Sequence, residues 1–463
     1  MLVRRRTLFG PVAAATLSLL FLTSAARGQD VDPLQAPDTQ LEPIAWSDIE
    51  GWAADDHAAA FSAFRASCAP IIRQRRAPVD ARPIPLALRD TCKRAAAAGP
   101  LDTDKDKARA FFEENFRPVR VAKLGESTGL LTGYYEPIVD GSRFPNPEFH
   151  TPLYRRPSDL LIAGKKPPRG AFPNRASVVR LNTTNKKLVP YHDRAAIEDG
   201  ALDGQKLEIC WIKDPWEAMS IQIQGSVRVK LEDGIMLRLN YDAHNGHPYT
   251  AVGRILIERN LVPREEMSME RIRQWMHSNP DQARELRGTN RSFVFFRIVS
   301  LLADGEPSGA QGVPLTPGRS IAVDKVHSYG TPFFIDADLP IASARPTTKF
   351  RRLMVAQDTG SAIIGPARAD VYWGSGDEAG RVAGRFRHQG RFVMLIPREL
   401  DMVEAGKKMP LPPPKPVIPE GTEAKADTAA KPQADGKKPA AKWRRPGLPA
   451  ATPKAKTSSR RSP

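Results

Sequence analysis

The sequence predicts a mainly β protein with accessory helices, and three observations lead to this fold class. Short apolar or alternating runs separated by turn residues dominate from residue 129 onward, a pattern typical of strands. Upstream of that point, apolar residues recur at the spacing of amphipathic helices. The chain has 463 residues, of which 41% are hydrophobic, so it is long enough and apolar enough for two domains with a sizeable core.

Helical periodicity falls in five segments, two before the strand-rich part and three within it. They cover residues 52–66, 104–116, 252–259, 268–277 and 281–286. Ser268 stands at the start of the fourth segment and is a residue type that caps helix N-termini. We therefore expect the helices to be accessory to a β framework.

The predicted strands form two groups along the chain. They cover residues 207–212, 218–223, 227–231 and 236–239, and then 320–323, 332–335, 352–356 and 392–396. Glu232-Asp233-Gly234 lies between two strands of the first group and predicts a hairpin turn there.

The N-terminal 28 residues carry the features of an export signal. Arg4, Arg5 and Arg6 are followed by an apolar run over residues 8–22 and by small residues suited to cleavage. The run is shorter than the ~20 residues that span a bilayer, and no cysteine follows it as a site for a lipid anchor. We expect residues 1–28 to be a signal peptide and the protein to be periplasmic, with outer-membrane association left open.

Residues 401–463 are rich in Pro, Ala and Lys and poor in core-forming residues, so we expect a disordered tail. The formal net charge of +17 is uneven, because residues 407–463 contain many Lys and Arg and few acids. Basic tails act as electrostatic tethers. We therefore expect the tail to attach the protein loosely to the membrane or to other anionic envelope polymers, and we expect no nucleic-acid partner.

The three cysteines show no metal-binding spacing. Cys68 and Cys92 lie in one N-terminal segment, where they either pair in an oxidising compartment or remain two buried thiols. Cys210 lies in an apolar strand-like run and is expected in the core. His244 and His247 fit turn residues better than metal ligands. We expect neither a metal nor a cofactor, and we expect a monomer.

Three aspartates stand in similar surroundings in the C-terminal part of the strand-rich region. Asp324, Asp358 and Asp370 each lie at a strand end or in a loop beside an apolar run. Such carboxylates are either capping and turn residues or members of a site. Their interleaving with Gly-rich loops modestly favours a shared carboxylate site.

The segments around these aspartates carry a more specific pattern. Residues 357–365 read Gln-Asp-Thr-Gly-Ser-Ala-Ile-Ile-Gly and residues 369–374 read Ala-Asp-Val-Tyr-Trp-Gly. The matching segments elsewhere, in chain order, are 131–137, 223–226, 245–249, 290–296, 378–380, 383–384 and 390–392. Over residues 129–397 the sequence resembles the membrane-bound lytic murein transglycosylase A family, and the aspartate segments resemble its three-aspartate domain.

The resemblance implies a double-psi β-barrel domain interrupted by an inserted second β-domain, with a glycan-binding groove between them. The expected limits are 29–137 for the N-terminal helical segment and first part of the barrel, 138–305 for the insert, and 306–400 for the second part of the barrel. It also implies cleavage of the MurNAc–GlcNAc β-1,4 bond of peptidoglycan with 1,6-anhydro-MurNAc ends, in cell wall turnover.

In such a family the last of the three aspartates is the catalytic acid, which is Asp370 in this sequence, with Asp358 and Asp324 as supporting site residues. Most glycosidases need two carboxylates. A transglycosylase uses the C6 hydroxyl of the sugar as its nucleophile, so one residue can protonate the glycosidic oxygen and then accept the hydroxyl proton. Asp370 must begin protonated, so burial or a neighbouring carboxylate such as Asp358 must raise its pKa.

The resemblance also nominates residues that contact the sugar. The expected aromatic faces and hydrogen-bonding groups are Tyr134, Tyr135 and Trp373, together with Thr132, Gly133, Gln224, Gly225 and Ser226. Taken alone, each aromatic residue fits core packing, and residues 224–226 fit a bulge or turn.

Two other functions remain open on the sequence. One is a non-catalytic peptidoglycan-binding or septation protein on the same barrel. The other is a hydrolase that uses water, with Asp377 or Glu378 as its second acid. Retention of Asp370 with the Gly-rich loops favours catalysis, and the lack of an obvious second acid favours transglycosylation.

Overall fold

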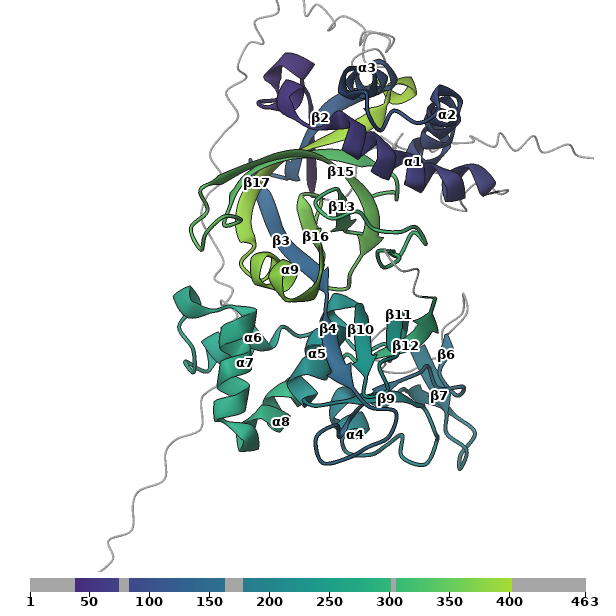
Figure 1. Ribbon diagram of the computed structural model, residues 1–463, viewed down its shortest axis with the longest axis vertical. Coiled ribbons are helices and arrows are strands. Elements are labelled where there is room, and N and C mark those ends of the chain that lie inside the picture. The colour runs from purple at the N-terminus through teal and green to yellow at the C-terminus, as the bar shows by residue number, and fades with distance from the viewer. Residues whose placement is uncertain (1–37, 75–82, 163–177, 301–304, 402–463) are drawn as a thin grey trace, which may run out of the picture. The chain divides into compact units, whose positions relative to one another are not determined.

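The computed structural model describes residues 38–74, 83–162, 178–300 and 305–401 (Figure 1). The predicted signal peptide, residues 1–28, and the predicted tail beyond residue 401 lie outside these described residues. The described chain divides between a large barrel sheet with helices beside it and a second strand-rich domain inserted between two barrel strands.

The barrel sheet has eight strands, six of which close into a barrel. In sheet order the strands are β1 (Thr39–Pro43), β2 (Phe116–Lys123), β17 (Arg387–Pro397), β14 (Pro332–Leu339), β15 (Thr348–Thr359), β13 (Ser320–Val323), β16 (Arg368–Ser375) and β3 (Gly129–Glu136). Strand β3 also pairs with β17, so the ring from β17 to β3 is closed. The interior is filled by buried side chains such as Phe333, Phe350 and Val371.

Register within the barrel brings two of the three aspartates together. The short central strand β13 pairs in parallel with β15 and antiparallel with β16. Ala322 on β13 lies opposite Asp358 on one side and Asp370 on the other. Strand β16 in turn pairs in parallel with β3, which sets Asp370 opposite Thr132. The two carboxylates therefore flank one small residue on neighbouring strands.

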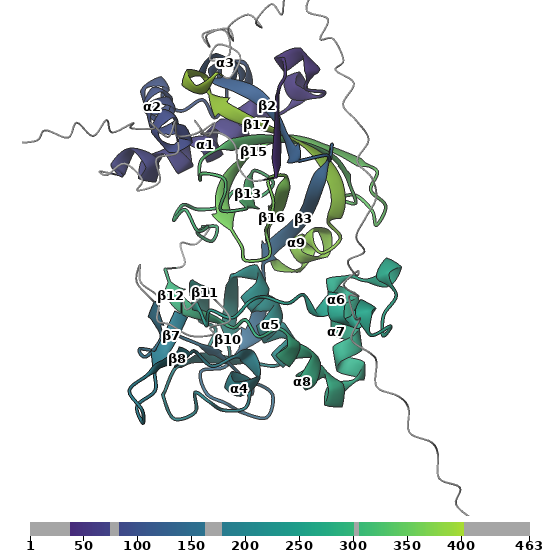
Figure 2. The same ribbon diagram turned by 180° about the vertical axis from the view of Figure 1, so that it is seen from behind.

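Three N-terminal helices lie beside the barrel sheet, as Figure 2 shows from behind: α1 (His57–Arg73), α2 (Pro83–Ala98) and α3 (Lys105–Asn115). Helices α1 and α2 contact β15 and β17, and their core with α3 is rich in phenylalanine. Cys68 and Cys92 form a disulfide between α1 and α2, so of the two states that the sequence left open, the structure has the bonded one.

The short 3₁₀ helices of the barrel part are η1 (Trp46–Asp48), η2 (Trp52–Ala54) and η4 (Arg398–Leu400). A short helix, α9 (Gly376–Ala383), packs against β3 and β16.

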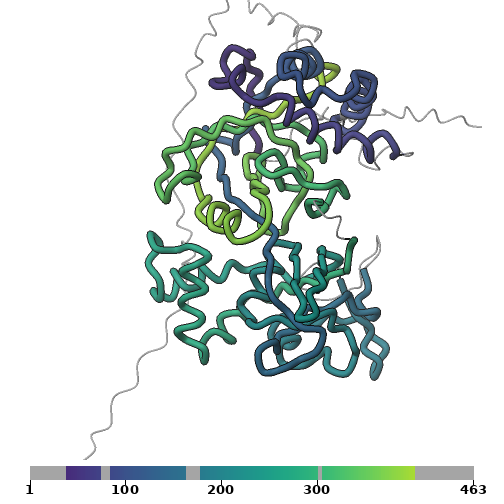
Figure 3. The backbone as a smooth tube through the Cα atoms, in the orientation of Figure 1, coloured from purple at the N-terminus to yellow at the C-terminus, as the bar shows by residue number. Residues whose placement is uncertain are grey.

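The inserted domain is built on a four-stranded sheet of β12 (Val294–Val299), β11 (Met236–His244), β10 (Ser226–Leu231) and β4 (Ile138–Gly141). Its smaller sheets are β5 (Thr151–Tyr154) with β9 (Glu208–Ile212), and β6 (Leu161–Ile162) with β7 (Val178–Leu181) and β8 (Leu188–Pro190). Its helices are α4 (Arg194–Glu198), α5 (Pro215–Gln224), α6 (Val252–Glu258), η3 (Arg264–Glu266), α7 (Met269–Ser278) and α8 (Pro280–Thr289). The chain passes directly from β3 into β4, as the tube in Figure 3 shows.

One predicted strand is wrong: residues 218–223 belong to helix α5. A short apolar run has the same composition in a buried helix as in a strand, so periodicity alone cannot separate the two. The flanking residues decide the matter. Asp214 caps the helix by accepting a hydrogen bond from the backbone N–H of Trp216, Pro215 is its first residue, and Gly225 ends it with a φ of +84°. Residues 224–226 therefore form a helix end and turn into β10, as one of the two interpretations predicted.

Most other predicted elements are confirmed. Asp104 caps α3 and Ser268 caps α7 through their side chains. Gly234 has a φ of +83° in the turn between β10 and β11, as the hairpin prediction requires. Cys210 is a buried free thiol. The fold class, a mainly β protein with a barrel, an inserted second β-domain and accessory helices, is confirmed.

Candidate active site

The aspartate pair faces a pocket of about 120 Å³ between the barrel and the insert. On the barrel side it is lined by Tyr134, Ala322, residues 358–363 and Asp370. On the insert side it is lined by Arg194, residues 222–224, Tyr249, Asn290, Ser292 and Val294. We call these the barrel wall and the insert wall.

Asp370 has one hydrogen-bond donor among the described side chains. The Oγ1 of Thr132 on the paired strand β3 donates to its Oδ1 over 2.5 Å. Burial raises the pKa of the Asp370 carboxyl above its usual range, while the Arg368 guanidinium and the Thr132 hydrogen bond lower it in part. A carboxyl held this way retains a proton to higher pH than a free aspartate.

Asp358 is held by three donors. Its Oδ1 accepts the backbone N–H of Ala310 at 2.8 Å and of Thr359 at 2.9 Å, and its Oδ2 accepts the Tyr134 hydroxyl at 2.9 Å. The pKa of Asp358 is raised above its usual range, chiefly by burial, while these three hydrogen bonds lower it in part and the charge of Asp370 raises it further. Donors of this kind stabilise the ionised form of a carboxylate.

The difference in donors separates the two carboxyls chemically. Two carboxyls in one site can share a single proton. The proton then resides on the carboxyl whose ionised form is less well stabilised. With one donor against three, that carboxyl is Asp370. Burial raises the pKa of both carboxyls, and the hydrogen bonding favours Asp370 as the proton donor and Asp358 as the carboxyl whose ionised form is better stabilised.

The insert wall offers amide and hydroxyl groups. Gln224 ends helix α5, and its Oε1 accepts the backbone N–H of Tyr135 at 3.0 Å. Asn290 uses its Oδ1 to accept the backbone N–H of Thr250 at 3.1 Å. Burial raises the pKa of the Tyr249 hydroxyl, so this group stays a neutral hydrogen-bonding partner.

Most of the lining residues, among them Gln222, Tyr249 and Asn290, were not singled out as site residues from the sequence. Tyr249 and Asn290 lie within the segments 245–249 and 290–296 that carried the family resemblance, which is the signal that pointed to them. Gln222 was obscured because its segment was interpreted as a strand.

The structure places Asp324 and Trp373 outside the pocket lining. The Asp324 carboxylate accepts the backbone N–H groups of Val326 and Gly365, at 3.1 and 2.5 Å, and so organises a turn. The Trp373 ring packs within the barrel against Phe350 and Phe386. Its position therefore agrees with core packing, the alternative role that the sequence offered for this tryptophan.

Five other predicted residues do not line the pocket but contact elements that do. They are Thr132, Gly133, Tyr135, Gly225 and Ser226. A Cβ on Gly133 would come within 2.9 Å of the Ala383 backbone, so glycine is required for α9 to pack on β3. The Tyr135 ring covers α9 at Gly380, which also leaves no room for a Cβ there. Gly225 and Ser226 form the turn from α5 into β10. Of the predicted set, Tyr134, Gln224, Asp358 and Asp370 line the pocket itself.

Buried ion pairs join the barrel to the insert behind the pocket. Glu136, the fully buried last residue of β3, accepts from Arg228 Nε at 2.7 Å and from Arg238 Nη2 at 2.9 Å. Both arginines belong to the insert sheet. Removing one partner of such a buried set is strongly destabilising, so these pairs hold the two walls in register.

Two chemical features of the described residues narrow what the site can do. Within the four described ranges, no group of three or more His, Cys, Asp or Glu side chains is placed to hold a metal ion. The carboxylates that line the pocket are Asp358 and Asp370. The arrangement can therefore perform acid–base chemistry on a polar ligand lying between the two walls.

Comparisons with known proteins match both parts of the molecule. Residues 130–297 match the model of the MltA specific insert domain, and residues 319–396 match that of the 3D domain. The chain is 32% identical over 287 residues to the membrane-bound lytic murein transglycosylase A of Vibrio cholerae, which covers 60% of the chain and 69% of that relative. The chain belongs to the membrane-bound lytic murein transglycosylase A family. It is also 32% identical to the Escherichia coli protein of that name and spans 65% of its length.

Solved structures of this family share the fold. The membrane-bound lytic murein transglycosylase of Agrobacterium tumefaciens is 33% identical, with a TM-score of 0.71 over 80% of this chain and 99% of the other. MltA from Neisseria gonorrhoeae is 31% identical, with a TM-score of 0.63 over 78% and 94% of the two chains. Escherichia coli MltA with bound chitohexaose is 27% identical, with a TM-score of 0.53 over 78% and 92%.

Proposed function

We propose that this family member is a peptidoglycan lytic transglycosylase. It cleaves the β-1,4 bond between MurNAc and GlcNAc and leaves 1,6-anhydro-MurNAc ends, with Asp370 as its catalytic acid and base. The names of its relatives and the chitohexaose bound by one of them support a glycan substrate. The observation that carries the proposal is the unequal hydrogen bonding of two buried carboxyls that face a polar pocket, with one donor to Asp370 and three to Asp358.

The reaction needs two proton transfers at one residue. Protonated Asp370 donates to the glycosidic oxygen as the bond to C1 of MurNAc breaks, and the leaving GlcNAc takes that proton as its hydroxyl. The C6 hydroxyl of the same MurNAc then bonds to C1, and the Asp370 carboxylate accepts its proton. The acid is regenerated and no water is consumed.

Asp358 acts in this scheme as a fixed negative charge. The sugar develops positive charge at C1 as the bond breaks, and an anion held by Tyr134 and two backbone amides needs no reorganisation to stabilise it. Its charge also favours the protonated form of Asp370 before the reaction.

The hydrolase alternative requires a second carboxylate that activates water. Asp377 and Glu378, the candidates for that role, are residues in the first turn of α9 and do not line the pocket. Asp358 lines it, but its oxygens are occupied by three donors. Transglycosylation is therefore favoured over hydrolysis.

Mass spectrometry of digested murein tests this function. We expect anhydro-MurNAc products from the wild-type protein and from Glu378→Gln, whose side chain lies outside the pocket, and a strongly reduced yield from Asp370→Asn. Products with reducing ends would overturn the proposal in favour of hydrolysis. Binding to murein without any product would overturn it in favour of a non-catalytic protein.

The cellular setting proposed here is the envelope. Relatives of this chain are named membrane-bound, and no helix among the described residues is long and apolar enough to cross a membrane. The predicted signal peptide and basic tail favour a periplasmic protein that is loosely attached to anionic envelope components. Release of the protein from isolated membranes by high salt, without detergent, is the expected outcome of fractionation.

A further inference from the structure

A second, larger cavity of about 500 Å³ lies in the inserted domain and takes no part in the mechanism above. It is bounded by β5, α4 and the loop after it, β9, α5 and α8. The two residues it shares with the active-site pocket are Arg194 and Gln222. The two hollows therefore adjoin at these side chains.

The deepest groups of this cavity carry a net positive charge. Glu198 accepts from Arg194 Nη1 at 3.3 Å and from Nε and Nη2 of Arg287, each at 3.0 Å. The three side chains are largely buried, with exposed fractions of 18% for Glu198, 2% for Arg194 and 11% for Arg287. Two guanidinium groups share one carboxylate, so one positive charge is left uncompensated. A buried excess charge favours a ligand that brings a carboxylate.

Of the two arginines, Arg287 is the one able to meet a ligand. Arg194 is fixed by three further hydrogen bonds, to the Asn290 carbonyl at 3.0 Å, the Gln222 Oε1 at 2.6 Å and the Ser292 carbonyl at 2.7 Å. The Arg287 guanidinium binds Glu198 through Nε and Nη2, which leaves its Nη1 edge for another acceptor. That edge can form a charge-assisted hydrogen bond with an incoming carboxylate.

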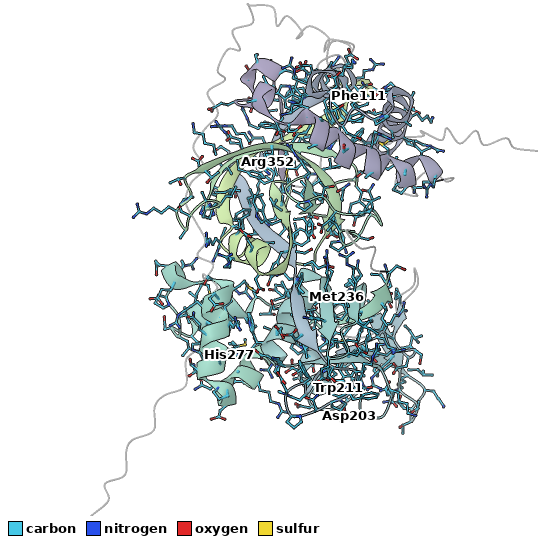
Figure 4. All side chains as sticks on the ribbon, in the orientation of Figure 1. Phe111, Asp203, Trp211, Met236, His277 and Arg352 are labelled. Atoms are coloured by element: carbon cyan, nitrogen blue, oxygen red, sulfur yellow. A yellow bond between two sulfur atoms is a disulfide. The ribbon has the colours of Figure 1, made fainter. Side chains whose placement is uncertain are left out.

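The walls and rim differ from this interior. Apolar and aromatic side chains form the walls: Pro152, Tyr154, Trp211, Pro215 and Phe293. The rim carries Asp199 and Asp203 against one exposed cation, Arg284, which pairs with Asp199. Figure 4 shows Asp203 close to Trp211 at this end of the insert. The rim thus has an excess negative charge, and the cavity runs from an acidic mouth to a basic floor.

We propose that this cavity binds the peptide stem of a murein strand whose glycan lies in the active-site pocket. The proposal rests on the proposed function. A stem peptide is a short zwitterion with carboxylates and one free amine, which matches a basic floor, an apolar wall and an acidic mouth. It is attached to MurNAc, so a bound glycan presents it beside the shared side chains of Arg194 and Gln222. An extended tetrapeptide reaches about 14 Å, long enough to enter an adjoining cavity.

Binding of a free stem peptide gives the first test. The probe is L-Ala-γ-D-Glu-meso-diaminopimelate-D-Ala, titrated into the full chain and followed by calorimetry and by the NMR signal of the Trp211 indole. We expect saturable binding that weakens about tenfold or more in Arg287→Gln, since a charge-assisted hydrogen bond is lost. Arg259→Gln is the matched control, because Arg259 pairs with Glu285 and does not line the cavity.

Arg287→Lys is the conservative variant. It keeps a positive charge beside Glu198, so it should fold and should retain part of the affinity for the peptide. If Arg287→Gln does not fold, Arg287→Lys carries the comparison, because it removes the planar guanidinium edge and should bind the peptide more weakly than Arg259→Gln does. Absence of binding to the wild-type chain, equal affinity in Arg287→Gln and Arg259→Gln, or equal occupation of the cavity by a peptide-free glycan would each overturn the proposal.

Turnover separates this proposal from the proposed function. The wild type should cleave peptide-bearing strands with a lower KM than strands stripped of peptides by an amidase. Arg287→Gln should lose that preference while its rate on stripped strands stays unchanged. Anhydro products from both substrates with equal KM in the wild type would overturn the stem site and leave the transglycosylase function standing. No anhydro product from either substrate would overturn the function itself, while the peptide titration still decides the stem site.

Discussion

The two walls of the active-site pocket are built differently. The barrel wall places Asp358, Asp370 and Tyr134 on strands that are paired on both sides within a closed sheet. The insert wall presents Gln224 and Asn290 from the last residue of one helix and the residue that follows another. The two carboxyls with raised pKa values therefore sit on the stiffer wall, while the insert wall presents neutral hydrogen-bonding groups and the guanidinium of Arg194.

This difference follows from what each wall has to do. Proton transfer depends on sub-ångström placement of the reacting groups, and closed sheets hold their side chains more tightly than helix ends and loops. Hydrogen bonds to sugar hydroxyls and N-acetyl groups tolerate small adjustments. We infer that the barrel wall carries the chemistry and the insert wall carries recognition, a division that can be tested one wall at a time.

The largest effect is expected from Asp370→Asn on the barrel wall. The amide keeps the size of the side chain but cannot carry either proton transfer. A general acid–base residue contributes on the order of 10²–10⁴ in rate, and a residue that serves both steps should lie at or beyond the upper end. Release of anhydro-muropeptides per mole of folded protein measures it, with Glu378→Gln as control. The variant should still sediment with murein, and retention of more than about a tenth of the wild-type rate would contradict the assignment.

Asp358→Asn should lower activity less and should also move its pH dependence. The active form requires protonated Asp370, so activity is lost as pH rises through that pKa, which burial has already raised. A negative charge on Asp358 disfavours ionisation of a neighbouring carboxyl, so its removal should lower the pKa of Asp370 and move the alkaline limb to lower pH. On the alkaline side of the profile, a lower pKa leaves a smaller protonated fraction of Asp370, so the rate of the variant should fall furthest below that of the wild type there.

Asp324→Asn is the matched control for that experiment. Its carboxylate binds turn amides outside the pocket lining, so it should reduce stability and leave the position of the alkaline limb unchanged. If the alkaline limb moved equally in Asp358→Asn and Asp324→Asn, the charge of Asp358 would have no specific effect on the pKa of Asp370.

Tyr249→Phe probes the insert wall and should act on KM. The hydroxyl is a neutral partner in the pocket, and loss of one such hydrogen bond weakens binding by about 2- to 10-fold. We expect kcat to stay within a factor of about two, since that wall makes no proton transfer. Tyr241→Phe, at a 43% exposed position outside the pocket lining, is the control. A large fall in kcat with an unchanged KM would break the division between the walls.

Thermal stability should reveal the energetic cost of the barrel wall. Asp370 has a folded-state pKa above its unfolded value, so its stabilising contribution is present at low pH and is lost as pH rises through the folded pKa. Asp370→Asn should therefore melt a few degrees higher than wild type at about pH 7 and at nearly the same temperature at about pH 3, where both side chains are neutral in the folded state. A lower melting temperature at neutral pH would mean that burial of this carboxyl carries no cost.

The smallest effect is expected from removing the tail. A chain ending at residue 401 keeps both walls of the pocket, so its rate on short soluble glycans should equal that of the full chain. Its retention on anionic envelope material should fall, and the difference should fade as salt screens the charges. A loss of activity on soluble glycans would assign the tail a part in the site.

The local part of the architecture could be predicted from the sequence because it depends on neighbouring residues. Caps such as Asp104 and Ser268, the Gly234 turn and the alternation of the barrel strands all act within a few positions along the chain. The motif segments around Asp358 and Asp370 identified the family through residue order alone. The one predicted strand that proved to be a helix shows the limit of periodicity, although Asp214, Pro215 and Gly225 were local signals as well.

Only the tertiary structure decided which of the nominated residues meet. Asp358 and Asp370 become neighbours because both pair with Ala322, a consequence of parallel and antiparallel registers on either side of one short strand. The same closure packs the partly buried Trp373 against the barrel core and leaves Asp324 on a turn. Arg194 joins two hollows through contacts with Asn290 and Ser292, 96 and 98 positions away in the chain. Such contacts depend on sheet closure and domain packing between distant segments, whereas composition, spacing and periodicity describe only what lies close along the sequence.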